Sequence, residues 1–234
     1  MKSKEFYNCH FQTEFNGLID KQIYRKKFIP KNSELAFKEV DNKGIGFKSL
    51  TLDFDPFEGF QMKMDKSIKF TGANYATHLS YSFIIEKEFY QNIVKRFNFG
   101  KCQVLDLKDK LIDTEKDYYF IYPYYNNFQD LNFIECEYKY YNSNVRDFEK
   151  ANINISSKDE FMNHQREIYG NFPLDVRIDK YVFDISYYDY DMLILNEVEN
   201  LPTNLKFSSE LMGYLKEQKV KCLFTSPFKV NYSK

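Results

Sequence analysis

The sequence predicts an α+β protein built mainly from antiparallel sheet, with a few short helices. Polar and apolar residues alternate with a period of two over many short stretches, which is typical of half-buried strands. Other stretches instead place their apolar residues at helical spacing. The chain has 234 residues, of which 43% are hydrophobic, and this is enough for a substantial core in one large domain or two closely packed ones.

A strand-rich region is expected over residues 1–80. Its clearest strand is 45–54, which the pair Asp55-Pro56 ends, whereas 71–80 shows neither period and is expected to be a loop. A central block over 81–141 then begins. It opens with a strand at 81–85 and a helix over 86–97, whose acidic start and basic end suit the helix dipole.

Further strands are expected at 102–107, 117–125 and 130–141, and their alternation indicates antiparallel sheet. The polar stretch 142–156 is expected to be a connection. The last block, 157–234, opens with a helix in which Ser157 and Glu160 have the spacing of a capping box. Two strands at 178–186 and 191–198 and a final strand, helix and strand complete it.

This final unit, from Leu205 to Phe224, repeats the order of the stretch from Phe83 to Leu105. In each copy a Glu precedes an apolar pair, another apolar residue follows five positions after the Glu, and a Cys lies in the outgoing strand. Glu88 and Cys102 are 14 residues apart, whereas Glu210 and Cys222 are 12 apart, so the first copy carries two extra positions. The pattern predicts a weak internal duplication, and chance similarity between two common units is the alternative.

Charge and composition exclude several classes of partner. The 33 basic and 34 acidic residues leave a net charge of −1, so no overall field attracts nucleic acid or anionic lipid. No apolar run of signal-peptide or membrane-span length is present, and we expect a cytosolic protein with no membrane partner. The four cysteines form no CxxC pair and are expected to be free thiols.

The motifs of nucleotide hydrolysis and of serine or zinc proteolysis are missing from the sequence, and no catalytic, cofactor or metal site is predicted. One alternative is a divalent-metal nuclease or hydrolase, since Glu137 and Lys139 share a strand face and Asp106 or Asp117 could complete the set. A solvated face of an amphipathic strand is the simpler interpretation of Glu137 and Lys139.

Two further clusters are candidates for binding. Asp184, Asp189 and Asp191 crowd one stretch that could bind calcium or a basic partner, or could be a polar turn between strands. The tyrosine run from 118 to 125 is predicted to contact a partner, although one face of such a strand is more often core. The predicted partner-binding residues are Tyr118, Tyr122, Tyr124 and Tyr125.

The C-terminal unit resembles the close of bacterial polymorphic-toxin immunity proteins of family eleven. The residues that carry the resemblance are Leu201-Pro202, the segment 205–211 with its Ser209-Glu210 pair, and the segment 220–227, which ends in Pro227. The stretch from Phe83 to Glu88, continued by Val104 and the aromatic strands through Tyr125, is similar to the family's central block. Here Glu86 stands where the family usually has Ser, and Cys222 stands where Gly is frequent.

The resemblance implies a protein that binds and neutralises a cognate toxin by contact, without chemistry or cofactor. A net charge of −1 does not indicate mimicry of nucleic acid, so the chemistry of the toxin stays open.

Overall fold

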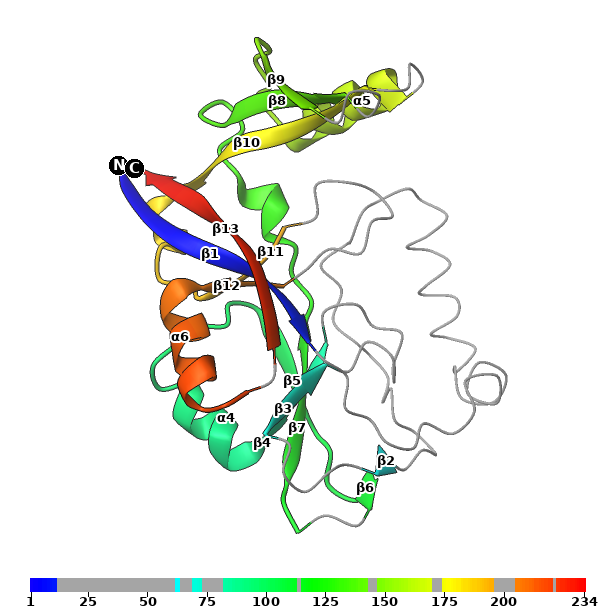
Figure 1. The fold of residues 1–234 in the computed structure, drawn as a ribbon, viewed down its shortest axis with the longest axis vertical. Helices are drawn as coiled ribbons and strands as arrows, with labels where there is room; N and C mark the ends of the chain where they lie inside the picture. Colours follow the sequence, from blue (N-terminus) through cyan, green and yellow to red (C-terminus); the bar gives the residue numbers. More distant parts are fainter. Residues whose placement is uncertain are drawn as a thin grey trace, which may run out of the picture.

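The computed structural model describes residues 1–11, 62–63, 69–72, 82–112, 115–142, 147–169, 174–195, 205–220 and 222–234. Within these residues two larger sheets and three helices form the molecule (Figure 1), and most strand pairs are antiparallel. The predicted α+β class is therefore confirmed. The strand predicted at 45–54 and most of the loop predicted at 71–80 lie outside the described residues.

The larger sheet has seven strands in the order β11-β12-β1-β13-β10-β8-β9, and its β10 and β13 pair in parallel. The first and last strands of the chain lie side by side in its centre, with Lys2 opposite Tyr232 (Figure 1). The strands are β1 (Lys2–Phe11), β8 (Glu137–Asn142), β9 (Asp147–Ala151), β10 (Leu174–Asp184), β11 (Met192–Ile194), β12 (Leu205–Ser208) and β13 (Cys222–Ser233).

The smaller sheet has four antiparallel strands in the order β3-β4-β7-β5, and β2 and β6 form a short parallel pair. These strands are β2 (Met62–Lys63), β3 (Phe70–Gly72), β4 (Phe83–Glu86), β5 (Cys102–Asp106), β6 (Leu111–Ile112) and β7 (Tyr118–Pro123). The helices are α4 (Lys87–Ile93), α5 (Lys158–Tyr169) and α6 (Ser209–Glu217), with 3-10 turns η1 (Asn127–Asp130) and η2 (Ile185–Tyr187).

Two of the predicted elements need correction. The strand expected over 130–141 begins only at Glu137, because η1 and a turn at Asn132 that accepts the N–H groups of Glu135 and Cys136 precede it. The expected connection over 142–156 contains β9, which pairs with β8. An edge strand such as β9 keeps much of its surface in water, so its polar sequence is compatible with a strand.

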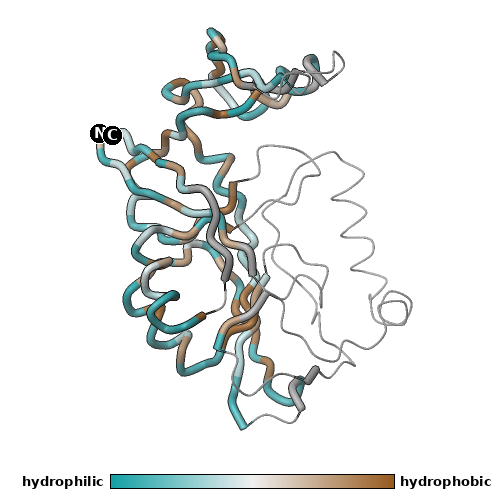
Figure 2. Tube along the Cα trace, in the orientation of Figure 1, coloured by the Kyte–Doolittle hydropathy of each residue, from teal (hydrophilic) through white to brown (hydrophobic). Residues whose placement is uncertain are grey.

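Two buried clusters hold the fold together. One lies under α5, where Phe161 packs against Phe128 and Phe133. The other joins α4 and α6 to the strands of both sheets. Figure 2 shows the hydrophobic stretches mostly on the strands, while the outer turns of the helices are hydrophilic. Each helix therefore contributes one apolar face, as its sequence periodicity predicts.

The two predicted strand–helix–strand units have the same topology. In each unit the two strands joined by the helix run parallel and flank a third, antiparallel strand, which we call the middle strand. One further strand pairs with the outer edge of the strand before the helix. The first repeat is β3, β4, α4, β5 and the middle strand β7, and the second repeat is β11, β12, α6, β13 and the middle strand β1.

The two repeats also have the same register, residue by residue. The pair Phe70↔Ile85 between β3 and β4 corresponds to the pair Met192↔Phe207 between β11 and β12, and both residues of the pair are shifted by 122 positions. Around the middle strands the pairs Val104↔Ile121 and Cys102↔Pro123 correspond to Phe224↔Cys9 and Cys222↔Phe11. The agreement continues until the bulge between Tyr7 and Asn8. The predicted duplication is confirmed in topology and register.

Equivalent side chains of the two helices enter one shared core. Phe89 and Ile93 of α4 correspond to Leu211 and Leu215 of α6, and all four are buried in the same cluster. The repeats differ in the origin of the middle strand: β7 follows β5 in the first repeat, whereas β1 at the start of the chain supplies it in the second. The second repeat is therefore a circular permutation of the first.

Candidate functional site

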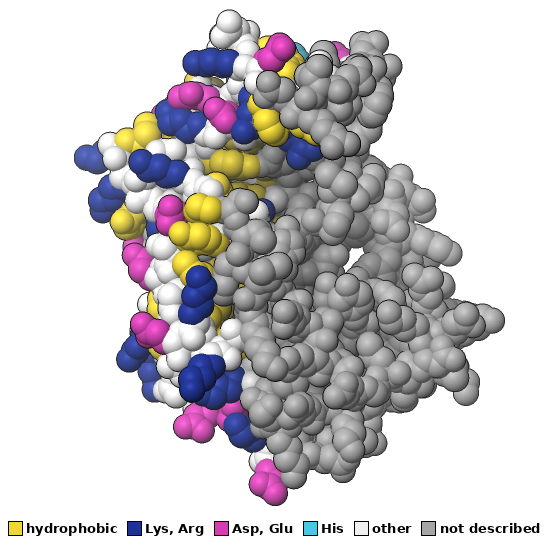
Figure 3. Space-filling model, viewed as in Figure 1, with side chains coloured by type: hydrophobic (Ala, Val, Ile, Leu, Met, Phe, Trp, Pro, Cys, Tyr) yellow, Lys and Arg dark blue, Asp and Glu magenta, His cyan; other side chains and the backbone are white. Residues whose placement is uncertain are grey.

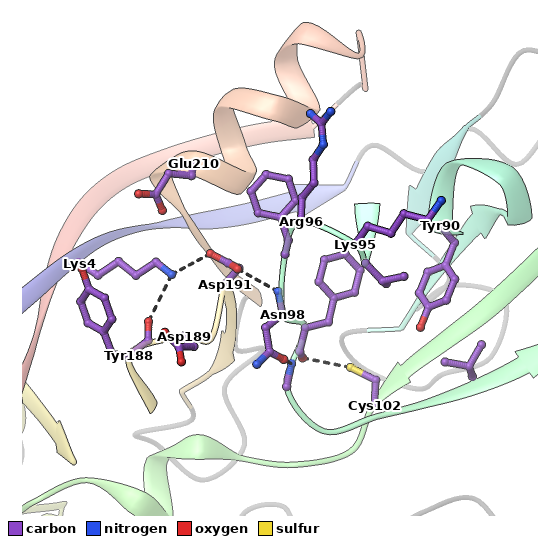
Figure 4. A pocket seen from close by; sticks show the side chains of 15 residues that line it. Lys4, Tyr90, Lys95, Arg96, Asn98, Cys102, Tyr188, Asp189, Asp191 and Glu210 are labelled. Carbon is purple, nitrogen blue, oxygen red and sulfur yellow. Dashed lines mark hydrogen bonds and ion pairs between the residues drawn. The ribbon is translucent and has the colours of Figure 1, made fainter. Parts of the chain in front are cut away.

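A groove of about 890 Å³ lies where the two repeats meet. One wall is the end of α4 with the turn that leads into β5, and the other wall is formed by residues 188–191 with the starts of β1 and α6 (Figure 4). The side chains that shape it are Lys4, Tyr90, Val94, Lys95, Arg96, Phe97, Asn98, Phe99, Cys102, Val104, Tyr188, Asp189, Asp191 and Glu210.

The turn that forms one wall belongs to the first repeat, which has two more residues than the second between the Glu in the first turn of its helix and the Cys that begins the following strand. Its Asn98 makes a short parallel bridge with Tyr190: the Asn98 N–H donates to Asp191 Oδ2 at 2.9 Å and the Asp191 N–H donates to the Asn98 carbonyl at 2.7 Å. Gly100 has a φ of 67°, and a Cβ there would lie 3.1 Å from the Tyr190 ring. Glycine is favoured at this position for both reasons.

Asp191 and Lys4 fix the other wall. The Lys4 ammonium lies 2.8 Å from Asp191 Oδ1 and also donates to the Tyr190 carbonyl at 3.0 Å. The Ser208 hydroxyl donates to the same Oδ1 at 2.7 Å and accepts from the Leu211 N–H, which caps α6. Both charged side chains are nearly buried, at 12% and 10% exposure. The charges of Lys4 and Asp191 thus compensate each other within the fold.

The first repeat contains an equivalent ion pair. Glu86 occupies the helix N-cap position of Ser208, and Lys116 lies 2.9 Å from its Oε1. Lys116 and Lys4 each lie two residues before the middle-strand residue that pairs with the N-cap. Because a lysine at this position of the middle strand pairs with an acidic residue in both repeats, the pairing of Lys4 with Asp191 is a structural feature of the fold.

Other charges around the groove are exposed. Within the described part of the chain, no ion pair or hydrogen bond involves the side chains of Lys95, Asp189 and Glu210. The Arg96 guanidinium lies over the Tyr214 ring, 5.4 Å from its centroid. Figure 4 shows the two acids on the wall of Lys4 and Tyr188, and the two basic residues on the wall formed by α4. The groove therefore has an acidic side and a basic side.

Apolar and aromatic groups also line the groove. Phe99 is buried, whereas Tyr90, Phe97 and Tyr188 are half-buried and present part of their rings. The Cys102 thiol donates to the Phe99 carbonyl at 3.3 Å, and burial raises the pKa of this thiol to about 12. Since the thiolate is the nucleophilic form, Cys102 is inert near neutral pH.

The described face that is visible in Figure 3 carries no large patch of a single charge sign. In Figure 3 basic and acidic side chains are interspersed over the visible described face, in keeping with the net charge of −1. The separation of signs across the groove is thus a local feature. None of the helices in the described residues is long and apolar enough to cross a membrane.

The predicted tyrosine surface is only partly on the outside. Tyr118 is 1% exposed and belongs to the core, because it lies on the buried face of the middle strand β7, so it presents almost no surface to a partner. Tyr122, Tyr124 and Tyr125 are half-buried, and their contact role stays a prediction. Burial raises the pKa of Tyr125, whose hydroxyl donates to Asp130 at 2.6 Å. None of the four lines the groove.

The residues of the alternative nuclease site lie apart. Glu137 and Lys139 pair across strands with Lys180 at 3.0 Å and with Asp179 at 2.8 Å. Asp106 is in the other sheet, where a hydrogen bond from Lys87 at 2.7 Å holds the pKa of this carboxyl below its usual range. In the residues that the structure describes, no three His, Cys, Asp or Glu side chains gather as metal ligands.

We expect the variants Glu137→Ala and Lys139→Ala each to lower the free energy of unfolding by less than about 1 kcal/mol, because exposed ion pairs contribute little. Urea denaturation followed by circular dichroism measures this effect. Binding of a partner at the groove should not change. A metal-dependent nuclease activity in the parent protein that Glu137→Ala abolishes would contradict this expectation.

The acidic stretch 184–191 does not converge on a cation. Asp184 accepts the Ser186 N–H at 2.9 Å and begins η2, and Asp191 pairs with Lys4, which leaves Asp189 exposed on the groove.

Sequence patterns did not indicate that Lys95, Arg96 or Glu210 would line a groove. The nearest signal was the two extra positions of the first repeat, which lengthen the turn on one wall of the groove. Comparison with known proteins finds no family model, no curated protein and no solved structure that matches this chain.

Proposed function

We propose that the protein is a bacterial, cytosolic immunity factor that binds a cognate toxin and neutralises it by contact, without a cofactor or a catalytic step. The observation that carries the proposal is the groove, which combines exposed charges of both signs with half-buried aromatic rings. Protein interfaces commonly combine aromatic and arginine anchors with polar residues at the rim.

The rigidity of the groove supports the proposal. Two hydrogen bonds between Asn98 and Asp191 hold one wall: the Asp191 N–H donates to the Asn98 carbonyl, and the Asn98 N–H donates to the Asp191 carboxylate. The nearly buried pair of Lys4 and Asp191 holds the other wall. A site that is ordered before binding loses less conformational entropy when the partner arrives. A preformed groove of this kind suits recognition by contact.

The resemblance to immunity family eleven adds support of a different kind. Several residues that carry it are core residues of the second repeat, among them Leu205, Phe207 and Leu211. They describe the packing of the repeat and carry no information about the partner. The groove lies beside them, so a shared scaffold could present different contact residues to different toxins. A nuclease function based on Glu137 and Lys139 has no comparable support.

Co-expression with the neighbouring gene tests the proposal. We expect a toxin-domain gene next to the gene for this chain, and growth of a bacterial host that expresses both proteins should be restored. The two proteins should also purify as one complex. An unrelated toxin serves as the control, since its host should not be protected. If the host is not protected and no complex with the neighbouring protein forms, the immunity function is refuted.

A further inference from the structure

We infer that the toxin inserts a protruding loop into the groove, with a Lys or Arg side chain facing Asp189 and Glu210 and a carboxylate facing Lys95 and Arg96. This inference rests on the proposed immunity function and specifies its partner surface. Two features of the groove support it, namely the arrangement of its exposed charges and the different residues that the second repeat carries at the positions of the basic wall.

The exposed charges favour an occupant that carries both signs. Asp189 and Glu210 lie on one wall and Lys95 and Arg96 on the other (Figure 4), and the pairing of Lys4 with Asp191 leaves the first wall acidic. A phosphate-rich ligand would meet two carboxylates, and like charges at an interface disfavour binding. A peptide loop can present an ammonium and a carboxylate a few residues apart, which matches the two walls.

The apolar lining of the groove also suits a loop. Its rings come from Tyr90 and Phe97 on one wall and from Tyr188 on the other, and Val94 and Val104 also line it. Val94 and Val104 are 40% and 39% exposed, so apolar surface is available in the groove itself. Burial of such surface under a loop supplies affinity, whereas the surrounding charges set its orientation.

The second repeat carries different exposed residues at the positions that form the basic wall. With the shift of 122 residues that relates the repeats, Lys95 and Arg96 correspond to Glu217 and Gln218, and the turn that follows is two residues shorter. The two copies keep equivalent core residues but differ in these exposed ones. Of the two repeats, the first therefore carries the exposed basic pair and the longer turn, which together form one wall of the groove.

Charge reversal with a matched control tests the inference. Glu210→Lys and Glu88→Lys change the equivalent exposed residue in the first turn of α6 and of α4, so both lose the same favourable interaction with a helix N-terminus. Only Glu210 lines the groove. We expect the Kd for the toxin to rise about tenfold or more in Glu210→Lys and in Lys95→Glu, and by less than about twofold in Glu88→Lys.

Salt dependence and crosslinking supply further readouts. The difference between the parent protein and Glu210→Lys should shrink when NaCl is raised to about 0.5 M, because salt screens exposed charges. A photocrosslinking residue at Val94 should capture the toxin. The same residue at Ile134, which is 76% exposed and outside the groove, should not.

The outcomes separate the inference from the proposed function. If the parent protein binds the toxin and the groove variants bind equally well, the groove inference is wrong and the immunity function stands. If Glu210→Lys weakens binding but Lys95→Glu does not, the inference that the loop carries charges of both signs is wrong. If the parent protein neither binds nor protects, both the function and the inference fall.

Discussion

Asp191→Ala is expected to lower the free energy of unfolding by about 3 kcal/mol, because removing one partner of a buried ion pair leaves the other charge uncompensated. Lys4 would keep its position among the carbonyls of Tyr188 and Tyr190 without a counter-ion. The Ser208 hydroxyl and the Asn98 N–H would lose their acceptor as well. One substitution thus weakens the contacts that join β1, β11, α6 and the turn of the first repeat.

Urea denaturation at neutral pH measures this loss. The matched control is Asp189→Ala, which removes an exposed carboxylate two residues away and should change the stability by less than about 0.5 kcal/mol. A further substitution, Lys4→Met, in the Asp191→Ala background should recover part of the loss, because it removes the unpaired charge. Equal stabilities for Asp191→Ala and Asp189→Ala would show that the pair does not hold the groove.

Local sequence patterns predicted the parts of the fold that depend on local burial. The helical spacing of Phe89 and Ile93 indicated the inner face of α4, and both side chains are buried. The patterns failed where distant partners decide the structure. The polar residues of β9 form a strand because β8 lies beside them, and Tyr118 is core because β7 lies between β4 and β5.

The groove could not be predicted for the same reason. Its two walls meet through Asn98 and Asp191, which are 93 residues apart in the sequence. No periodicity reports such a contact. The comparison of Glu88 and Cys102 with Glu210 and Cys222 did locate the two extra positions, but only the register of the sheets shows that these positions form a wall.

The permuted relation of the two repeats predicts that the chain tolerates a matching rearrangement. In a circular permutant, a short Gly/Ser linker joins Lys234 to Met1, and new ends are opened between Lys108 and Asp109. The linker closes a hairpin between β13 and β1, whose ends already lie opposite each other at Lys2 and Tyr232. The new ends lie in an exposed turn.

This rearrangement exchanges the roles of the repeats. The second repeat becomes continuous in the order β11, β12, α6, β13 and β1, which is the order that the first repeat now has. The first repeat instead receives its middle strand β7 from near the new start of the chain. Since each order already folds once within the native molecule, we expect the permutant to keep a cooperative thermal transition and the circular dichroism spectrum of the parent protein.

Two comparison chains make the expectation specific. Deletion of residues 1–11 removes β1, which lies between β12 and β13, and should abolish the cooperative transition. A permutant opened between Glu86 and Lys87 cuts the junction of β4 and α4 and should also fail to fold. If the permutant opened at Lys108 fails as these two do, the order of the strands would matter beyond their pairing. If it folds, its middle strands are positioned by the register and by the shared core of α4 and α6, because these are the features that the rearrangement leaves unchanged.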